Sequence, residues 1–166
     1  MTTKTIDATT EHMARRELRR QPLKAVARQA PAFIQSGSSI GEAIAAMQSH
    51  AGDSLLVCVG ERLLGVLTER DIVQRVLARG VEPDALVDVF MTREPDTLTP
   101  DSTLVEALEL MERHGYRSVP LVSPDGRIEG VVRQTDILAF VAEAFPQEIL
   151  NLPPRPEQVA ETAEGG

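Results

Sequence analysis

The sequence predicts an α+β fold made of two tandem β-α-β-β-α repeats. Two observations support this fold class: the chain matches itself at a nearly fixed offset, and each copy alternates between helical and strand-like hydrophobic spacing. Of the 166 residues, 42% are hydrophobic and only 3% are aromatic. This composition suffices for one compact domain or two small halves that share a core of aliphatic side chains.

The internal match runs at an offset of 64 to 65 residues. Residues 31–50 overlay residues 95–114, and after a one-residue insertion residues 63–76 overlay residues 128–141. The aligned identities are Pro31 with Pro95, Ala43 with Ala107, Met47 with Met111, His50 with His114, Gly65 with Gly130 and Asp71 with Asp136. The chain is therefore a duplicated unit.

Each copy has the same expected order of elements. Helix-capping side chains precede apolar residues at helical spacing; they are Ser38 or Ser39 in the first copy and Asp101, Ser102 or Thr103 in the second. Two short strand-like runs follow, split by turn signals at Gly60-Glu61 and at residues 124–126. Helical spacing then returns and ends at Gly80 or Pro146. We predict a strand, a helix, a hairpin and a second helix in each repeat.

The chain divides into four segments. We expect a flexible basic N-terminal arm at 1–23, repeats at 24–82 and 83–145, and a Pro-rich acidic tail at 146–166. The first 30 residues carry seven Lys or Arg and three acidic residues, although the whole chain has a formal charge of −8. This balance argues against general binding to nucleic acid or anionic membranes, and the basic arm is typical of a solvated surface.

Other chemistries lack the residues they require. Cys58 is the sole cysteine, so neither an internal disulfide nor a cysteine-based metal site is expected, and it lies in an apolar run typical of a core strand. We find no glycine-rich phosphate loop, no metal-ligand spacing among the three histidines and no defensible catalytic constellation. His50 and His114 are expected to bond carbonyls at helix C-termini. We expect a non-enzymatic protein without a cofactor or metal, located in the cytoplasm.

Two seven-residue stretches carry a resemblance to a known family. The sequences GVLTERD at 65–71 and GVVRQTD at 130–136 resemble the strand-to-helix motif of cystathionine-beta-synthase (CBS) domains. The segments at 88–108 and 116–122 extend the resemblance, which covers roughly residues 24–145. It implies a tandem CBS pair, or Bateman module, with pseudo-two-fold symmetry, sheets packed together and helices outside.

The motif also has a physical interpretation of its own. A strand that ends at Thr68 and turns into a helix directs hydroxyl and backbone donors to one place, where a helix N-terminus favours an anion. Asp71 in the first helical turn is an acceptor that suits a ribose diol. The alternative is that Thr68, Asp71, Thr135 and Asp136 only cap helices.

The resemblance implies two clefts, each combining the motif of one repeat with strands of the other. The residues carried over to cleft A are Thr68, Arg70, Asp71, Thr97, Leu98, Arg117 and Ser118. Those carried over to cleft B are Phe33, Ile34, Asp53, Ser54, Arg133, Thr135 and Asp136. Cleft B departs from the family pattern, because Arg133 replaces a small hydroxyl and Asp53 places negative charge on the phosphate side. Arg133 either binds phosphate or pairs with Asp53 and closes the pocket, so cleft A is the better candidate.

These expectations lead to two functional hypotheses. In the first, the chain is a regulatory module that binds AMP, ADP, ATP or another adenosyl ligand between the repeats, with two chains forming the homodimer that the resemblance implies. In the second, it is an interaction protein with closed clefts that docks onto an enzyme or transporter. A DNA-binding role for residues 15–20 is the least supported reading, since no helix-turn-helix pattern accompanies them.

Overall fold

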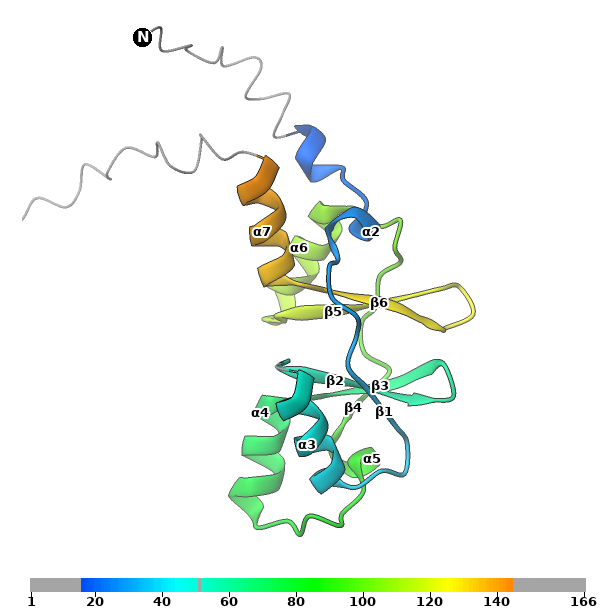
Figure 1. Cartoon of the computed structure of the whole chain (residues 1–166), viewed down its shortest axis with the longest axis vertical. Helices are drawn as coiled ribbons and strands as arrows, with labels where there is room; N and C mark the ends of the chain where they lie inside the picture. The colour runs from blue at the N-terminus through cyan, green and yellow to red at the C-terminus, as the bar shows by residue number, and fades with distance from the viewer. Residues whose placement is uncertain (1–15, 51, 145–166) are drawn as a thin grey trace, which may run out of the picture.

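The computed structural model describes residues 16–50 and 52–144, which form two α+β halves stacked through their sheets (Figure 1). The first half contains β1 (Phe33–Gln35), α3 (Ile40–His50), β2 (Ser54–Val59), β3 (Arg62–Thr68) and a helical segment that starts with α4 (Glu69–Asp71). The second contains α6 (Leu104–His114), β5 (Ser118–Val122), β6 (Ile128–Arg133) and α7 (Gln134–Ala144). Three short elements precede or connect the halves: α2 (Leu23–Val26), α5 (Val87–Phe90) and β4 (Thr92–Arg93). The predicted fold class is confirmed.

The two sheets lie at the centre and differ in their number of strands. The first has the order β1-β2-β3-β4, in which β1 is parallel to β2 and the other neighbours are antiparallel. The second contains only the antiparallel pair β5 and β6. The strand expected at the start of the second repeat is reduced to a single parallel bridge between Leu98 and Leu121. Its two backbone hydrogen bonds are Leu98 N to Pro120 O and Val122 N to Leu98 O.

The helix expected after β3 is present but changes type along its length. The first turn is α4, residues Ile72–Val76 form a π-helix, and Leu77–Arg79 form a 3₁₀ turn. The segment ends at Gly80, whose φ of +62° lies in the left-handed region that favours glycine. Ile72 and Val76, four residues apart, are both buried in the first core.

Each half has its own aliphatic core. The short helix α2 precedes the first half in sequence but packs on the second, and α5 follows the first half and packs on it. Val87 of α5 packs into the core formed around α3, β2 and β3, whereas Leu23 and Val26 of α2 pack against α6 in the second half. At the C-terminal end of the expected arm, Leu23 is fully buried and Leu18 also packs on the second core. Residues 1–15 of that arm and residues 145–166, which include the tail, lie outside the described residues.

The two halves make equivalent contacts, as duplication requires. The bridge between Ser39 and Leu86 has its counterpart in the bridge between Pro22 and Thr103. At one edge of the interface, the Ser54 and Ser118 hydroxyls, which occupy matching positions, are 3.0 Å apart.

At the opposite edge, backbone hydrogen bonds connect the tips of the two hairpins. Leu63 N donates to Gly126 O at 3.0 Å and Ile128 N donates to Glu61 O at 2.9 Å. No helix in the described part of the chain combines the length and apolar character needed to cross a bilayer.

Candidate functional site

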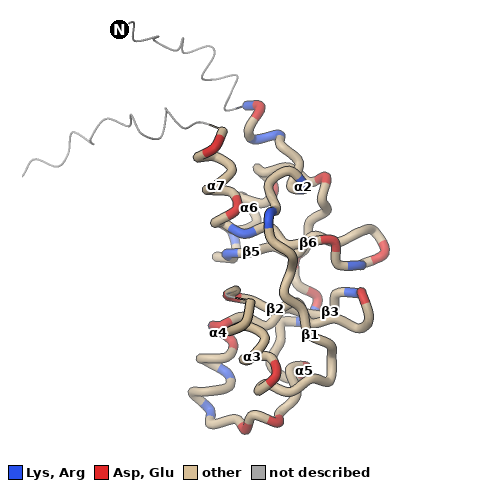
Figure 2. The backbone as a smooth tube through the Cα atoms, viewed as in Figure 1, with Lys and Arg blue, Asp and Glu red and all other residues tan. Residues whose placement is uncertain are grey.

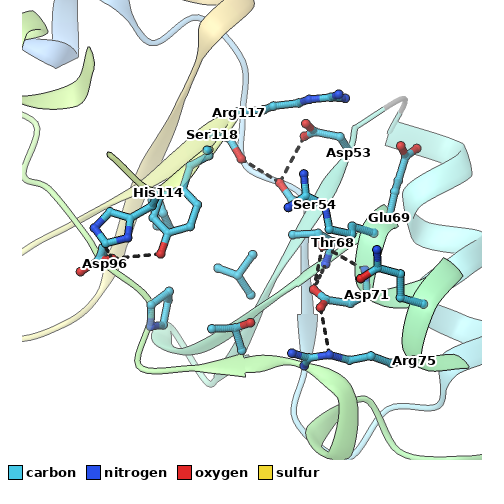
Figure 3. Close-up of a pocket in the computed structure, with 18 residues that line it drawn as sticks. Asp53, Ser54, Thr68, Glu69, Asp71, Arg75, Asp96, His114, Arg117 and Ser118 are labelled. Atoms are coloured by element: carbon cyan, nitrogen blue, oxygen red, sulfur yellow. Dashed lines mark hydrogen bonds and ion pairs between the residues drawn. The ribbon is translucent and has the colours of Figure 1, made fainter. Parts of the chain in front are cut away.

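A cavity of about 410 Å³ lies between the two halves, beside the start of the helical segment that follows β3 (Figure 3). Its walls come from β3, the first turns of that segment, the 92–96 linker, the C-terminus of α6 and the start of β5. The residues that line it include Asp53, Ser54, Val66, Thr68, Arg70, Asp71, Arg75, Asp96, His114, Tyr116, Arg117, Ser118 and Pro120. Five of the seven residues expected in cleft A, from both repeats, are therefore brought together.

Thr68 and Asp71 form a capping box at the helix start. The Asp71 Oδ2 atom accepts hydrogen bonds from the Thr68 hydroxyl at 2.7 Å and from Thr68 N at 3.0 Å, while Asp71 N donates to Thr68 Oγ1 at 3.2 Å. The Asp71 Oδ1 atom lies 3.4 Å from Arg75 Nε. The cap that the alternative interpretation expected is thus present. The carboxylate is 12% exposed and borders the cavity.

The opposite wall belongs to the second repeat. Arg117 is exposed and extends from the start of β5, and Ser118 bonds Ser54 where the repeats meet (Figure 3). Asp53 directly precedes β2 and lies next to Ser54, whose hydroxyl is 3.4 Å from Asp53 Oδ1. Basic and acidic groups therefore line the same part of the cavity, and both signs of charge occur where the halves face each other (Figure 2).

The far end of the cavity contains three residues that sequence reasoning did not select for the site. Tyr116 donates its hydroxyl hydrogen bond to Asp96 Oδ2 at 3.0 Å, and the His114 ring stacks on Tyr116 with centroids 5.1 Å apart. His114 Nε2 also lies 3.8 Å from Asp96 Oδ2, so its surroundings differ from those of His50, which contacts Ala46 O as expected. Burial and the Asp96 carboxylate both raise the pKa of Tyr116, so its hydroxyl stays protonated at neutral pH.

Two residues expected in cleft A are not in the cavity wall. Leu98 packs against the second core and makes the bridge to Leu121, and Thr97 is exposed. Their neighbours Pro95 and Asp96 line the cavity in their place. The proline-aspartate pair precedes the expected strand, so a shift of one to two residues along the sequence would have found them.

The residues expected in cleft B are dispersed. Asp53 and Ser54 line the cavity described above, Phe33 is 58% exposed, and Ile34 packs against the first core. Thr135 is exposed, whereas Asp136 is 4% exposed and accepts a hydrogen bond from Arg133 N at 3.0 Å.

Arg133 does not contact Asp53 as one reading of the sequence expected. Its Nη1 atom donates to Gln29 Oε1, in the segment that connects α2 to β1. Its Nε atom is buried and has no hydrogen-bond partner within residues 16–50 and 52–144. The pairing differs from the expectation because the path of residues 27–32 between the halves brings Gln29 to this arginine.

Among the described residues, no group of three or more His, Cys, Asp or Glu side chains is arranged to hold a metal ion. Cys58 is buried and burial raises the pKa of its thiol, as expected for a core cysteine.

Comparison with known proteins places the chain among similar sequences and folds. An uncharacterized 17.7 kDa protein of Acidianus ambivalens is 31% identical over 105 residues, which are 63% of this chain and 63% of that protein, so the match spans less than two thirds of the relative. A CBS domain protein from Pyrobaculum aerophilum, complexed with AMP, superposes with a TM-score of 0.67 at 22% identity, covering 74% of this chain and 99% of the other.

A second solved structure is the CBS domain pair of protein MJ0100 in complex with 5′-methylthioadenosine and S-adenosyl-L-methionine. It has a TM-score of 0.66 at 25% identity and covers 72% of this chain and 98% of the other. The CBS domain family model matches residues 23–78 and 86–143, one match for each repeat. The chain therefore belongs to the CBS domain family and contains a tandem pair of these domains.

Proposed function

We propose that the chain is a regulatory module that binds an adenosyl ligand, with AMP as the leading candidate, in the cavity between its two CBS repeats. The observation that carries the proposal is the meeting of Thr68 and Asp71 from one repeat with Arg117 and Ser118 from the other around a single hollow. Its volume of about 410 Å³ falls within the roughly 300–1,000 Å³ of small-molecule pockets. A ligand held by both repeats is sensitive to their relative position.

The capping box leaves Asp71 able to bind a ribose. A carboxylate has about four lone-pair sites, and here two are taken by Thr68 and one faces Arg75. The remaining capacity, on a carboxylate held in place by the cap, suits one or both hydroxyls of a sugar diol. The cap and the binding role are therefore compatible, and the cap orients the carboxylate in advance.

The other walls suit the remaining parts of a nucleotide. Val66, Pro120 and the Tyr116 ring provide apolar surface for a purine, and Arg117 and Arg70 provide guanidinium groups for a phosphate. Four carboxylates also line the cavity, those of Asp53, Glu69, Asp71 and Asp96. This negative charge favours a ligand with one phosphate over the more highly charged ATP. The solved CBS pair with methylthioadenosine and S-adenosyl-L-methionine supports the choice of an adenosyl compound.

Binding and the role of Asp71 are tested together by calorimetry. AMP is expected to bind the wild-type chain more tightly than ATP, and at 100 times its dissociation constant to stabilise it by about 2.7 kcal/mol. Asp71→Ala is expected to weaken AMP binding roughly 10- to 100-fold, because hydrogen bonds to a charged group contribute about 1.5–3 kcal/mol. Asp84→Ala, which removes an exposed carboxylate outside the cavity, serves as the control. Equal AMP affinity in Asp71→Ala and Asp84→Ala would remove Asp71 from the site.

The second candidate function is an interaction module, and exposed apolar side chains favour it. Val73, Leu77 and Leu138 are 56%, 63% and 68% exposed on the two helical segments that follow the hairpins. These segments lie on the same side of the molecule (Figure 1). We propose that a second copy of the chain covers this side. Light scattering should then give twice the mass of one chain. A monomer that responds to no adenosyl ligand would instead support docking onto another protein.

A further inference from the structure

Arg133 stands at the position in the second repeat that Thr68 occupies in the first. The backbone is the same at both places: Arg133 N donates to Asp136 Oδ2 at 3.0 Å as Thr68 N donates to Asp71 Oδ2 at 3.0 Å. The following residues agree too, since Gln134 N donates to Arg117 O and Glu69 N donates to Asp53 O, both at 2.9 Å. The backbone hydrogen bonds at these two positions therefore match, and the side chains of Thr68 and Arg133 differ.

The duplication defines where a second hollow would lie. Gly52 corresponds to Tyr116, and Arg28 corresponds to Thr92, at the same offset that relates the repeats. Tyr116 and Thr92 both line the first cavity. The walls of the second hollow are therefore the loop at Gly52 and the segment 27–32.

The Arg133 guanidinium lies between these two walls. Its Nη1 atom donates to Gln29, next to Arg28, and its Nη2 atom is 3.7 Å from the place that a Cβ on Gly52 would occupy. The Nε atom is buried and has no hydrogen-bond partner among the described residues, so the inner part of the guanidinium is enclosed, although the side chain as a whole is partly exposed. Thr68, in contrast, folds its short side chain back onto Asp71 and leaves the first hollow open.

The segment 27–32 is also held against the second repeat. Arg28 makes a double hydrogen bond to Glu143 of α7, with distances of 2.6 and 2.5 Å. This pair raises the pKa of Arg28 and lowers that of Glu143, so both remain charged near neutral pH. The wall that bears Gln29 is thus fixed beside Arg133.

From these contacts we propose that Arg133, held by Gln29, fills the second hollow and limits the chain to one adenosyl ligand. The inference rests on the proposed function, since it concerns how many copies of that ligand bind. The duplicated fold supplies two equivalent places, and a single side chain decides that only the one at Asp71 is open. In a chain without this arginine, ligand would bind at Asp136 as well.

Calorimetric stoichiometry with AMP as the probe tests the proposal. Wild type is expected to bind one AMP per chain. Asp71→Ala is expected to lose this binding, with no other site that binds AMP at wild-type affinity. Arg133→Thr, which installs the residue of the first repeat, is expected to bind two AMP molecules, the second more weakly because Asp53 stands where the first site has Arg117, and to bind two adenosines, which carry no phosphate. In the double variant Asp71→Ala with Arg133→Thr, only the second site should still bind ligand. Arg79→Thr, which removes an exposed arginine outside both hollows, should stay at one.

The outcomes separate this inference from the proposed function. Two AMP molecules per wild-type chain, or one adenosine per chain in a folded Arg133→Thr variant, would overturn the filling of the second hollow by Arg133 while leaving nucleotide binding intact. If Arg133→Thr does not fold, the wild-type stoichiometry and the Asp71→Ala titration decide the question. No heat with AMP or adenosine in wild type and Arg133→Thr alike would overturn both proposals together.

Discussion

Arg117 shows how one side chain can be assigned to one part of a ligand. It reaches the cavity from the second repeat, near Ser54 and Ser118, whereas Asp71 is held on the opposite wall by Thr68 (Figure 3). A guanidinium there serves a phosphate and has no partner on an adenosine lacking one. Under the proposed function, the wall at Arg117 is therefore assigned to the phosphate and the wall at Asp71 to the ribose.

We predict that Arg117→Ala weakens AMP binding roughly 10- to 100-fold, because a charge-assisted hydrogen bond contributes about 1.5–3 kcal/mol. Binding of adenosine should be unchanged, since it carries no phosphate. Competition titrations of both ligands measure the difference, with Arg113→Ala on the exposed end of α6 as the control. An equal loss for AMP and adenosine would place Arg117 elsewhere than at the phosphate.

For single residues, the sequence predicts a contact when the two partners are close together in the chain. Thr68 and Asp71 are three residues apart, so their motif is visible locally. Asp96 and Tyr116 meet only after the linker and α6 have packed, and no local pattern reports that meeting. The partner of Arg133 was missed for the same reason, because Gln29 is 104 residues away.

The N-terminus of helix α6 has the same kind of cap as the helix start at Thr68. Unlike Thr68, the N-terminus of α6 does not line the cavity. The Thr103 hydroxyl and Glu106 form a capping box like that of Thr68 and Asp71, and these hydrogen bonds lower the pKa of Glu106. The two threonines thus share a structural role, while only Thr68 lines the cavity. This pair can separate a cap from a binding residue.

Thr103→Ala and Thr68→Ala are each expected to cost about 0.5–2 kcal/mol of stability in urea unfolding, the usual effect of losing a threonine cap. Only Thr68→Ala should also weaken AMP binding, because Asp71 loses the hydroxyl that orients it. If both variants keep wild-type affinity for AMP, then Thr68 is a cap and nothing more.

The elements were predictable where capping and spacing agree, and less so where tertiary packing decides. The capping signals and apolar spacing of α6 predicted a helix at the observed place. The π-helix at Ile72–Val76 has no such signal, because its helical spacing is that of an ordinary α-helix. The first strand of the second repeat shrank to one bridge at Leu98, since strand length depends on a neighbour as well as on composition.

The arrangement of the whole molecule depends on a close approach at Gly65. A Cβ there would lie 2.7 Å from Thr92 O and 2.6 Å from Met91 Sδ, at the place where β4 pairs antiparallel with β3. The equivalent Gly130 has space, since its nearest neighbour is a Leu121 side-chain atom at 3.7 Å. Duplication gives a matched pair of glycines with unequal surroundings.

Gly65→Ala is expected to destabilise the chain by about 1–3 kcal/mol, the usual cost of overpacking. Gly130→Ala should change stability little, because the added methyl makes only ordinary van der Waals contact. Thermal and urea unfolding of the two variants give the comparison. Similar losses in both would mean that the strand conformation, rather than the close approach of Met91 and Thr92, requires glycine.

The unequal edges of the interface determine how the halves can move. Two main-chain hydrogen bonds and the Arg127–Glu61 ion pair join the hairpin tips at one edge, whereas among the described residues one hydroxyl pair, Ser54 with Ser118, joins the other edge beside the cavity. A rotation about the hairpin tips breaks the fewest hydrogen bonds between the halves. It displaces α4 and α7 the most, because they lie on the side away from the tips. Small changes in the volume occupied between the repeats would thereby become larger changes in the spacing of these two outer helices.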